Sequence, residues 1–97
     1  MSDPAVSRAT VSRDCLIGNM RGLHARAAAK FVKLAGEFES DIQVTKGANT
    51  VSGLSIMGLM MLSAGKGCTV KVSATGSDAP KAVEAIAALI AAKFDED

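Results

Sequence analysis

Two hydrophobic periods alternate along this chain, and the order in which they come limits its possible folds more than any other feature. Alternating apolar and polar residues predict strands, whereas apolar residues spaced three and four apart predict helices. By this criterion the chain has the order strand, helix, strand, strand, helix, strand, helix. The predicted elements are strands at 9–17, 41–46, 49–53 and 68–74, helices at 24–36 and 55–64, and a last helix with Pro80 in its first turn and Phe94 in its buried stripe.

This order does not sustain a strand–helix–strand repeat, which argues against a doubly wound parallel sheet. A four-stranded, largely antiparallel sheet with the helices on one face fits it, and we therefore predict an α+β fold. Serine and threonine at alternate strand positions predict that the other face of the sheet is wet. The 97 residues are enough for one domain. We interpret 1–8 as a flexible leader and 9–97 as a single domain.

Composition excludes several function classes. The net charge is +1 and the aromatic residues are three phenylalanines, so we expect no binding of nucleic acid. No apolar run reaches the roughly 18 residues of a membrane span, so we expect no membrane insertion. The two cysteines, Cys15 and Cys68, are too few for a disulfide scaffold and indicate a reduced, cytoplasmic protein.

One place in the sequence combines several features that favour chemistry. His24, the only histidine, directly follows a glycine-containing loop and stands at the start of the first predicted helix. Free backbone amides and the helix dipole favour an anion there, and Arg21 and Arg26 flank the position. A histidine so placed can be a nucleophile whose phosphorylated form is stabilised by its surroundings. From local composition alone, an ordinary surface histidine is an equally good interpretation.

Other candidates are weaker. The segment 65–67 lacks the further residues of a phosphate-binding loop and is interpreted as a turn. One histidine and two distant cysteines cannot build a closed zinc site, so no metal is expected. The acidic residues 95–97 are interpreted as a solvated tail. The apolar run 56–62 is expected to lie mostly in the core, with Ile56 or Met57 left outward as a partner contact.

Three segments, in the right order, resemble a known family. Residues 22–28 (GLHARAA) resemble the motif G-L-H-[AT]-R-P-A, and 55–60 (SIMGLM) resemble S-I-M-G-[VL]-M. Residues 73–78 and 81–84 resemble the strand, turn and last helix of the same family. The family is HPr, the histidine phosphocarrier of the bacterial phosphotransferase system, and the resemblance extends from about residue 9 to 94. It implies an open-faced β-sandwich of order βαββαβα.

The resemblance also implies roles for individual residues. His24 would carry the phosphoryl group on Nδ1, Arg26 would neutralise it, and Ser55 would be phosphorylated by a kinase. Ala27 stands where proline is usual, and we expect the helix to form there because alanine is a strong helix former. The positions implied as partner contacts are Arg21, Ala25, Ala27, Lys30, Ile56 and Met57.

The implied partners are Enzyme I as phosphoryl donor, enzyme IIA-type proteins as acceptors and an HPr kinase/phosphorylase, with no cofactor. We expect a monomer that acts as a carrier in a relay rather than as an enzyme. Whether the carrier passes phosphoryl groups to sugar uptake or to a nitrogen-regulatory branch stays open. So do two rival functions, a regulatory module of the same fold that carries no phosphoryl group and a small-molecule-binding α+β domain.

Overall fold

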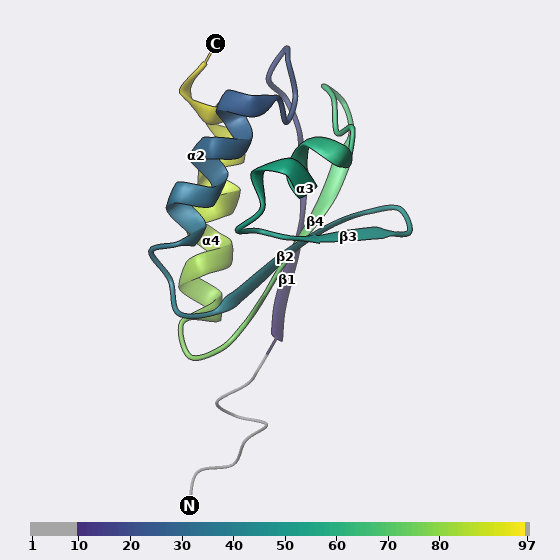
Figure 1. Cartoon of the computed structure of the whole chain (residues 1–97). Coiled ribbons are helices and arrows are strands. Elements are labelled where there is room, and N and C mark those ends of the chain that lie inside the picture. The colour runs from purple at the N-terminus through teal and green to yellow at the C-terminus, as the bar shows by residue number, and fades with distance from the viewer. Residues whose placement is uncertain (1–9, 97) are drawn as a thin grey trace, which may run out of the picture.

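The computed structural model, which describes residues 10–96, contains one antiparallel sheet with the strand order β1-β4-β2-β3 (Figure 1). The strands are β1 (Thr10–Leu16), β2 (Asp41–Lys46), β3 (Asn49–Ser52) and β4 (Thr69–Thr75). The helices are α2 (Ala25–Ala35), α3 (Ile56–Met61) and α4 (Ala79–Ala91), followed by a short turn, η1 (Lys93–Asp95). The predicted α+β fold and the order of its elements are confirmed, whereas the leader predicted at 1–8 lies outside the described residues.

The two faces of the sheet differ as the alternation predicts. Val44 and Val72 are paired neighbours on β2 and β4, and both are fully buried. On the opposite face, hydroxyl groups line up across strands: Thr10 Oγ1 lies 2.8 Å from Thr75 Oγ1, and Ser12 Oγ lies 3.0 Å from that of Ser73. The sheet therefore has a dry face for the helices and an opposite face lined by hydroxyl groups, as the prediction of a wet face requires.

Helices α2 and α4 lie side by side on the dry face (Figure 1). Helix α2 buries Phe31 together with three alanines and packs against α3 and α4. The buried stripe of α4 includes Ile86 and Ile90 and is continued by Phe94 in η1, which has no exposed surface. The stripe predicted for the last helix is confirmed.

Helix α3 corrects one expectation about the core. It ends at Met61 rather than near residue 64, and Ser63 has a φ of 53°, outside the helical region. In the run 56–62 only Leu59 and Leu62 are buried. The four exposed members are Ile56 (42%), Met57 (73%), Met60 (44%) and Met61 (75%). The helix packs mainly against α2 and β3, which leaves these four side chains exposed, so the prediction that most of this run lies in the core is wrong.

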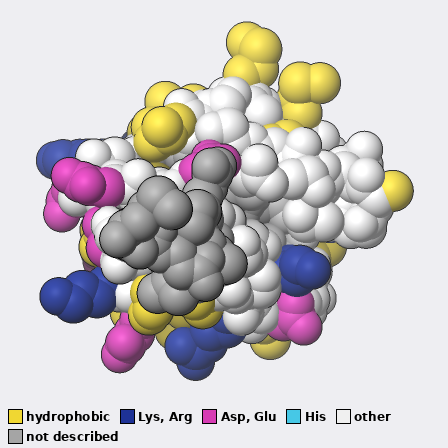
Figure 2. Space-filling view, turned by 90° about the horizontal axis from the view of Figure 1, so that it is seen from below, with side chains coloured by type: hydrophobic (Ala, Val, Ile, Leu, Met, Phe, Trp, Pro, Cys, Tyr) yellow, Lys and Arg dark blue, Asp and Glu magenta, His cyan; other side chains and the backbone are white. Residues whose placement is uncertain are grey.

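Charged side chains of both signs are interspersed around the molecule in the view from below (Figure 2), as a net charge of +1 leads one to expect. Nowhere in residues 10–96 is there a helix long and apolar enough to cross a membrane. Cys15 and Cys68 are both free thiols. They lie near each other at one end of the β1–β4 pair, since Cys15 is opposite Val70 and the Ile17 amide donates to the Cys68 carbonyl oxygen.

Asp78 links the start of α4 to the loop before β2. Its carboxylate accepts hydrogen bonds from the hydroxyl and the amide of Ser40 and from the amide of Glu39, both amides at 2.9 Å. The Ser40 hydroxyl, followed by the Glu39 amide, holds the pKa of Asp78 below its ordinary value. These hydrogen bonds favour the ionised carboxylate in the folded state.

We expect this linkage to make stability fall in acid. A carboxyl group with a lowered pKa in the folded state stabilises the fold above its unfolded pKa of about 3.9, and this contribution disappears as pH falls through the folded pKa. Asp78→Asn should therefore lower the thermal midpoint at pH 7 and flatten its decline below about pH 4. Thermal unfolding followed by circular dichroism between pH 7 and 2 measures both effects. Asp41→Asn, at an exposed strand position, is the control, and an equally steep acid decline in Asp78→Asn and the unaltered protein would contradict the assignment.

Candidate functional site

The loop between β1 and α2 is held by the loop that precedes β4. The Leu23 amide donates to the Ala64 carbonyl oxygen over 2.9 Å. Gly22 has a φ of 63°, and a Cβ atom there would lie 2.3 Å from the same oxygen. Only glycine combines this conformation with so close an approach. Gly22 therefore sets the point at which α2 begins.

His24 is the N-cap of α2, as the sequence predicts. Its backbone is extended, with φ −75° and ψ 178°, and its side chain does not cap the helix. The first turn of α2 contains no acidic residue. The free amides at this helix start and the positive end of the dipole are therefore available to an anion beside the imidazole ring.

The imidazole ring is bound by Glu96, a residue to which nothing in the sequence pointed. His24 Nε2 lies 2.5 Å from Glu96 Oε2, and the two side chains are 22% and 13% exposed. Asn19, which is fully buried, donates from Nδ2 to Glu96 Oε1 over 2.9 Å and to the Gly22 carbonyl oxygen over 2.8 Å. The interpretation of 95–97 as a solvated tail is thus wrong for Glu96. Asp95 is exposed as predicted, and Asp97 lies outside the described residues.

The turn η1 carries Glu96 back to the start of α2. Lys93, Phe94 and Asp95 all have positive φ, at 57°, 54° and 59°. This left-handed conformation costs on the order of 1–2 kcal/mol for each residue that is not glycine. Burial of Phe94 offsets the cost, as does Lys30 Nζ, which donates to the Phe94 carbonyl oxygen over 2.6 Å. Figure 1 shows the result, in which the segment that follows α4 lies beside the first turn of α2.

The surroundings of Glu96 act on its charge in opposite directions. Partial burial disfavours the ionised carboxylate, but hydrogen bonds from Asn19 and His24 and the electrostatic effects of His24 and Lys30 outweigh it. The net result is a pKa of Glu96 below its ordinary value. Glu96 is therefore ionised at neutral pH and can only accept hydrogen bonds.

Basic side chains gather next to this network. Arg21, Arg26 and Lys30 line a cavity of about 440 Å³, whose wall also contains Glu96. Arg21 borders a second hollow, of about 240 Å³, together with His24 and Met60. The structure thus brings together the predicted residues Arg21, Arg26 and Lys30 around the Glu96–His24 pair, although Lys30 is already bonded to the Phe94 carbonyl oxygen. Met60 is an additional neighbour of His24 that the sequence analysis did not include.

The other predicted positions divide into exposed and buried ones. Ser55 is the N-cap of α3, as predicted, and its Oγ accepts a hydrogen bond from the Gly58 amide over 2.9 Å. Ile56 and Met57 follow it and are exposed, and Ala25 is exposed at the start of α2. Ala27 has no exposed surface, because it faces the core from α2, so the expectation that it contacts a partner is wrong. The helix start forms with alanine at this position, as expected.

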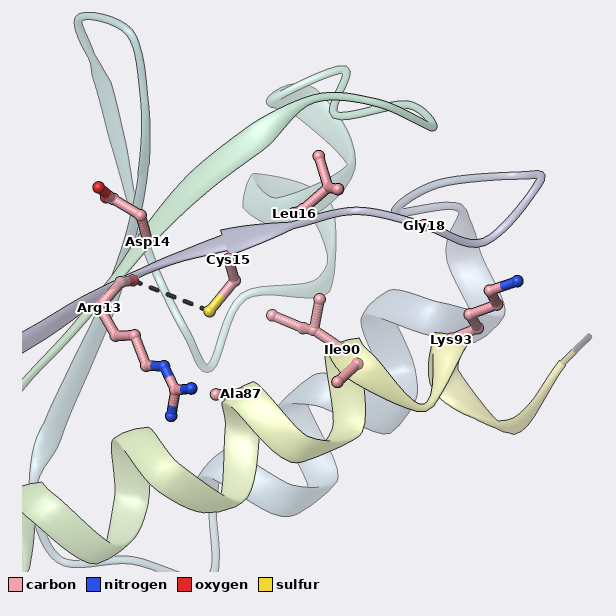
Figure 3. A pocket seen from close by; sticks show the side chains of 9 residues that line it. Arg13, Asp14, Cys15, Leu16, Gly18, Ala87, Ile90 and Lys93 are labelled. Carbon is pink, nitrogen blue, oxygen red and sulfur yellow. Dashed lines mark hydrogen bonds between the residues drawn. The ribbon is translucent and has the colours of Figure 1, made fainter.

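A separate cavity of about 360 Å³ between β1 and α4 contains Cys15 (Figure 3). The Cys15 thiol points toward α4 beside Ile90 and donates weakly to the Arg13 carbonyl oxygen over 3.8 Å. Burial raises the pKa of this thiol, and Arg13 and Asp14 act in opposite directions with smaller effects. A thiol that stays protonated is a poor nucleophile, so nothing at this cavity indicates reactivity of Cys15.

Comparison with known proteins identifies the family of the chain that carries this site. A family model described as "PTS HPr component phosphorylation site" matches residues 11–92. The chain belongs to the HPr family. HPr proteins are phosphocarriers of the phosphotransferase system, and this chain is such a phosphocarrier by family.

Individual relatives agree over nearly the whole chain. Phosphocarrier protein HPr of Cupriavidus necator is 46% identical over 86 residues, which cover 89% of this chain and 97% of that protein. Phosphocarrier protein NPr of Shewanella violacea is 45% identical over 86 residues, covering 89% and 94%. The crystal structure of HPr-C-His from Thermoanaerobacter tengcongensis has a TM-score of 0.86 at 44% identity and covers 90% of this chain and 98% of that one. The HPr fold therefore extends from β1 to the end of α4.

Proposed function

We propose that this HPr accepts a phosphoryl group from Enzyme I on His24 and passes it to enzyme IIA-type acceptors. The observation that carries the proposal is His24 itself, at the uncapped start of α2. One ring nitrogen, Nε2, is bonded to Glu96, while Nδ1 makes no hydrogen bond to any residue from 10 to 96. The ring is therefore held in place and still has a nitrogen free to attack phosphorus.

The transfer balances without a further reactant. A lone pair on the His24 nitrogen forms a bond to phosphorus as the bond from phosphorus to the donor histidine of Enzyme I breaks, and the donor ring keeps that electron pair. The phosphoryl oxygens carry negative charge throughout. The free amides of α2 and the Arg26 guanidinium are placed to stabilise this charge, which is the main task of a protein in phosphoryl transfer.

Exposed residues around the site suit a docking role. Arg21 and Ala25 flank His24, and Ile56 and Met57 are exposed on the adjacent helix α3. Methionine adapts its shape to different partners, which a carrier with one donor and several acceptors requires. We propose that the protein works in this way as a cytoplasmic monomer. Its acceptors belong to the sugar or the nitrogen-regulatory branch, and its relatives carry both HPr and NPr names.

A labelling experiment tests the proposed function. The purified chain is incubated with Enzyme I and phosphoenolpyruvate and then weighed by mass spectrometry before and after mild acid treatment. We expect a mass gain of one phosphoryl group that acid removes, because phosphohistidine is acid-labile. No gain would contradict the proposal. An acid-stable gain, seen only with an HPr kinase, would support the rival regulatory module.

Phosphorylation of Ser55 by an HPr kinase is expected to weaken docking to Enzyme I without unfolding α3. The added charge of about −1.5 to −2 lies at a helix start, where the Gly58 amide can still donate to it, so the thermal midpoint should stay level or rise. At a docking surface the same charge must lose water beside the exposed Ile56 and Met57, which is costly. We expect an affinity for Enzyme I that is at least several-fold lower, measured by calorimetry on modified and unmodified protein.

The matched control for this prediction is Ser55→Ala. It removes the N-cap hydroxyl, which should cost about 1 kcal/mol of stability, but adds no charge. Its affinity for Enzyme I should stay close to that of the unmodified protein. If both forms of the unaltered protein bind Enzyme I equally well, Ser55 acts only as an N-cap.

A further inference from the structure

We propose that Glu96, aligned by Asn19, is a positioning residue that keeps the proton of His24 on Nε2 and leaves the lone pair on Nδ1. The inference rests on the proposed function, because it concerns how the acceptor nitrogen is selected. The inference assigns roles to Asn19 and Glu96, which are 77 positions apart in the sequence. Neither residue belongs to the motif around His24 or to the arginines near it.

The direction of the hydrogen bonds is set at a backbone group. The Gly22 carbonyl oxygen can only accept, so the amide nitrogen of Asn19 must face it, at 2.8 Å. The same nitrogen has a second proton, which points to Glu96 Oε1 at 2.9 Å. Rotating the Asn19 amide would place oxygen against the Gly22 oxygen, and this repulsion prevents the alternative. Asn19 is fully buried, so no exposed orientation is open to it.

The hydrogen bond from Asn19 to Glu96 in turn determines which nitrogen of the His24 ring donates. Glu96 accepts a hydrogen bond from Asn19 on one oxygen and faces His24 Nε2 at 2.5 Å with the other. Since an ionised carboxylate only accepts, Nε2 must be the donor. In a neutral imidazole the proton on one nitrogen leaves the lone pair on the other. The nitrogen that can attack phosphorus is therefore Nδ1.

The same carboxylate is well placed after the transfer. When Nδ1 forms the bond to phosphorus and Nε2 keeps its proton, the ring acquires positive charge. Glu96 lies against that charge on the side opposite the incoming phosphoryl group, so it stabilises the charged ring without repelling the phosphoryl oxygens directly. A carboxylate that orients a histidine and stabilises its charged form has the same two roles in serine hydrolases.

The decisive variant is Glu96→Gln. Asn19 still presents a donor, so the new amide must turn its oxygen to Asn19 and its NH₂ group to His24. The ring then has to accept at Nε2, which moves its proton to Nδ1 and removes the nucleophile. Glu96→Ala merely releases the ring. We therefore expect the near-isosteric glutamine to slow phosphorylation by Enzyme I roughly 100-fold or more, and alanine only about 10-fold.

Two measurements on the full chain test this. Nitrogen-15 NMR of His24 reports which ring nitrogen carries the proton without any partner protein, and quenched-flow labelling with Enzyme I gives the transfer rate. Glu84→Gln is the control, because it makes the same chemical change at an exposed position of α4. Thermal unfolding shows that each variant is folded.

A proton that moves from Nε2 to Nδ1 in Glu96→Gln, with a rate below that of Glu96→Ala, supports the proposal. A tautomer that is the same in the unaltered protein and Glu96→Gln overturns it, as does a glutamine variant that transfers faster than alanine. If the unaltered protein accepts no phosphoryl group but the proton still moves from Nε2 to Nδ1 in Glu96→Gln, the proposed function fails and the positioning by Glu96 stands.

Discussion

His24→Ala is expected to accept no phosphoryl group from Enzyme I, while the chain remains folded. The substitution removes the imidazole ring at the start of α2, and no other histidine exists in the sequence. The side chain is partly exposed and does not cap the helix, so the loss of stability should be within about 1 kcal/mol. Mass spectrometry after incubation with Enzyme I and phosphoenolpyruvate measures the first effect, and thermal unfolding the second.

His24→Gln serves as a second variant, since its amide can still donate to Glu96 and should keep the network intact. Ser55→Ala is the matched control, because it alters another predicted phosphorylation position and leaves His24 in place. Acid-labile labelling that persists in both histidine variants would show that the phosphoryl group is carried elsewhere. Labelling that disappears in Ser55→Ala as well would point to a general loss of docking.

Arg26→Ala is expected to slow transfer to and from His24 by roughly 10- to 150-fold without abolishing it. Charge-assisted hydrogen bonds to a phosphoryl group contribute about 1.5–3 kcal/mol, which corresponds to this range. Arg26 is exposed and lines the cavity next to Glu96, so we expect Arg26→Ala to remain folded. Single-turnover kinetics with phosphorylated Enzyme I measures the rate.

The control for Arg26 is Lys33→Ala, which removes one positive charge from the last turn of the same helix. Arg26→Lys adds a finer test, because lysine keeps the charge but loses the planar fork that binds two phosphoryl oxygens at once. We expect Arg26→Lys to fall between alanine and the unaltered protein. Equal slowing by Arg26→Ala and Lys33→Ala would mean that overall charge, rather than a contact at the site, is responsible.

Local patterns account for most of the fold. The alternation in 41–46 places Ile42 and Val44 inward, and both are buried. Ser55 caps α3 because its hydroxyl satisfies a free amide, a purely local effect that the sequence shows directly. The length of α3 and the burial of its side chains could not be predicted from local patterns. A run of apolar residues reveals its hydrophobicity but not how many neighbours it has, and α3 has too few to bury Met57 or Met61.

The residues of the candidate site show the same difference between local effects and tertiary contacts. His24 and Arg26 are recognisable because their roles depend on neighbours in sequence: a glycine before them and a helix start around them. Glu96 depends on a contact with Asn19 across 77 residues, and on a left-handed turn of three residues none of which is glycine. Sequence propensity assigns no such turn, because it is stabilised by tertiary contacts, the burial of Phe94 and the hydrogen bond from Lys30. The residue that binds the His24 ring could therefore not be predicted from the sequence, although His24 itself could be recognised as a candidate.

The turn η1 also determines how activity should decay on heating. A segment whose backbone is strained, and which is held by one buried aromatic side chain and a few side-chain hydrogen bonds, opens at lower free energy than the paired strands. Each opening would withdraw Glu96 from His24 while the sheet stays intact. Acceptor activity should thus fade before cooperative unfolding begins. The amides of Asp95 and Glu96, which bond to the carbonyl oxygens of Ala92 and Lys93, would lose their protection from hydrogen exchange in step with it.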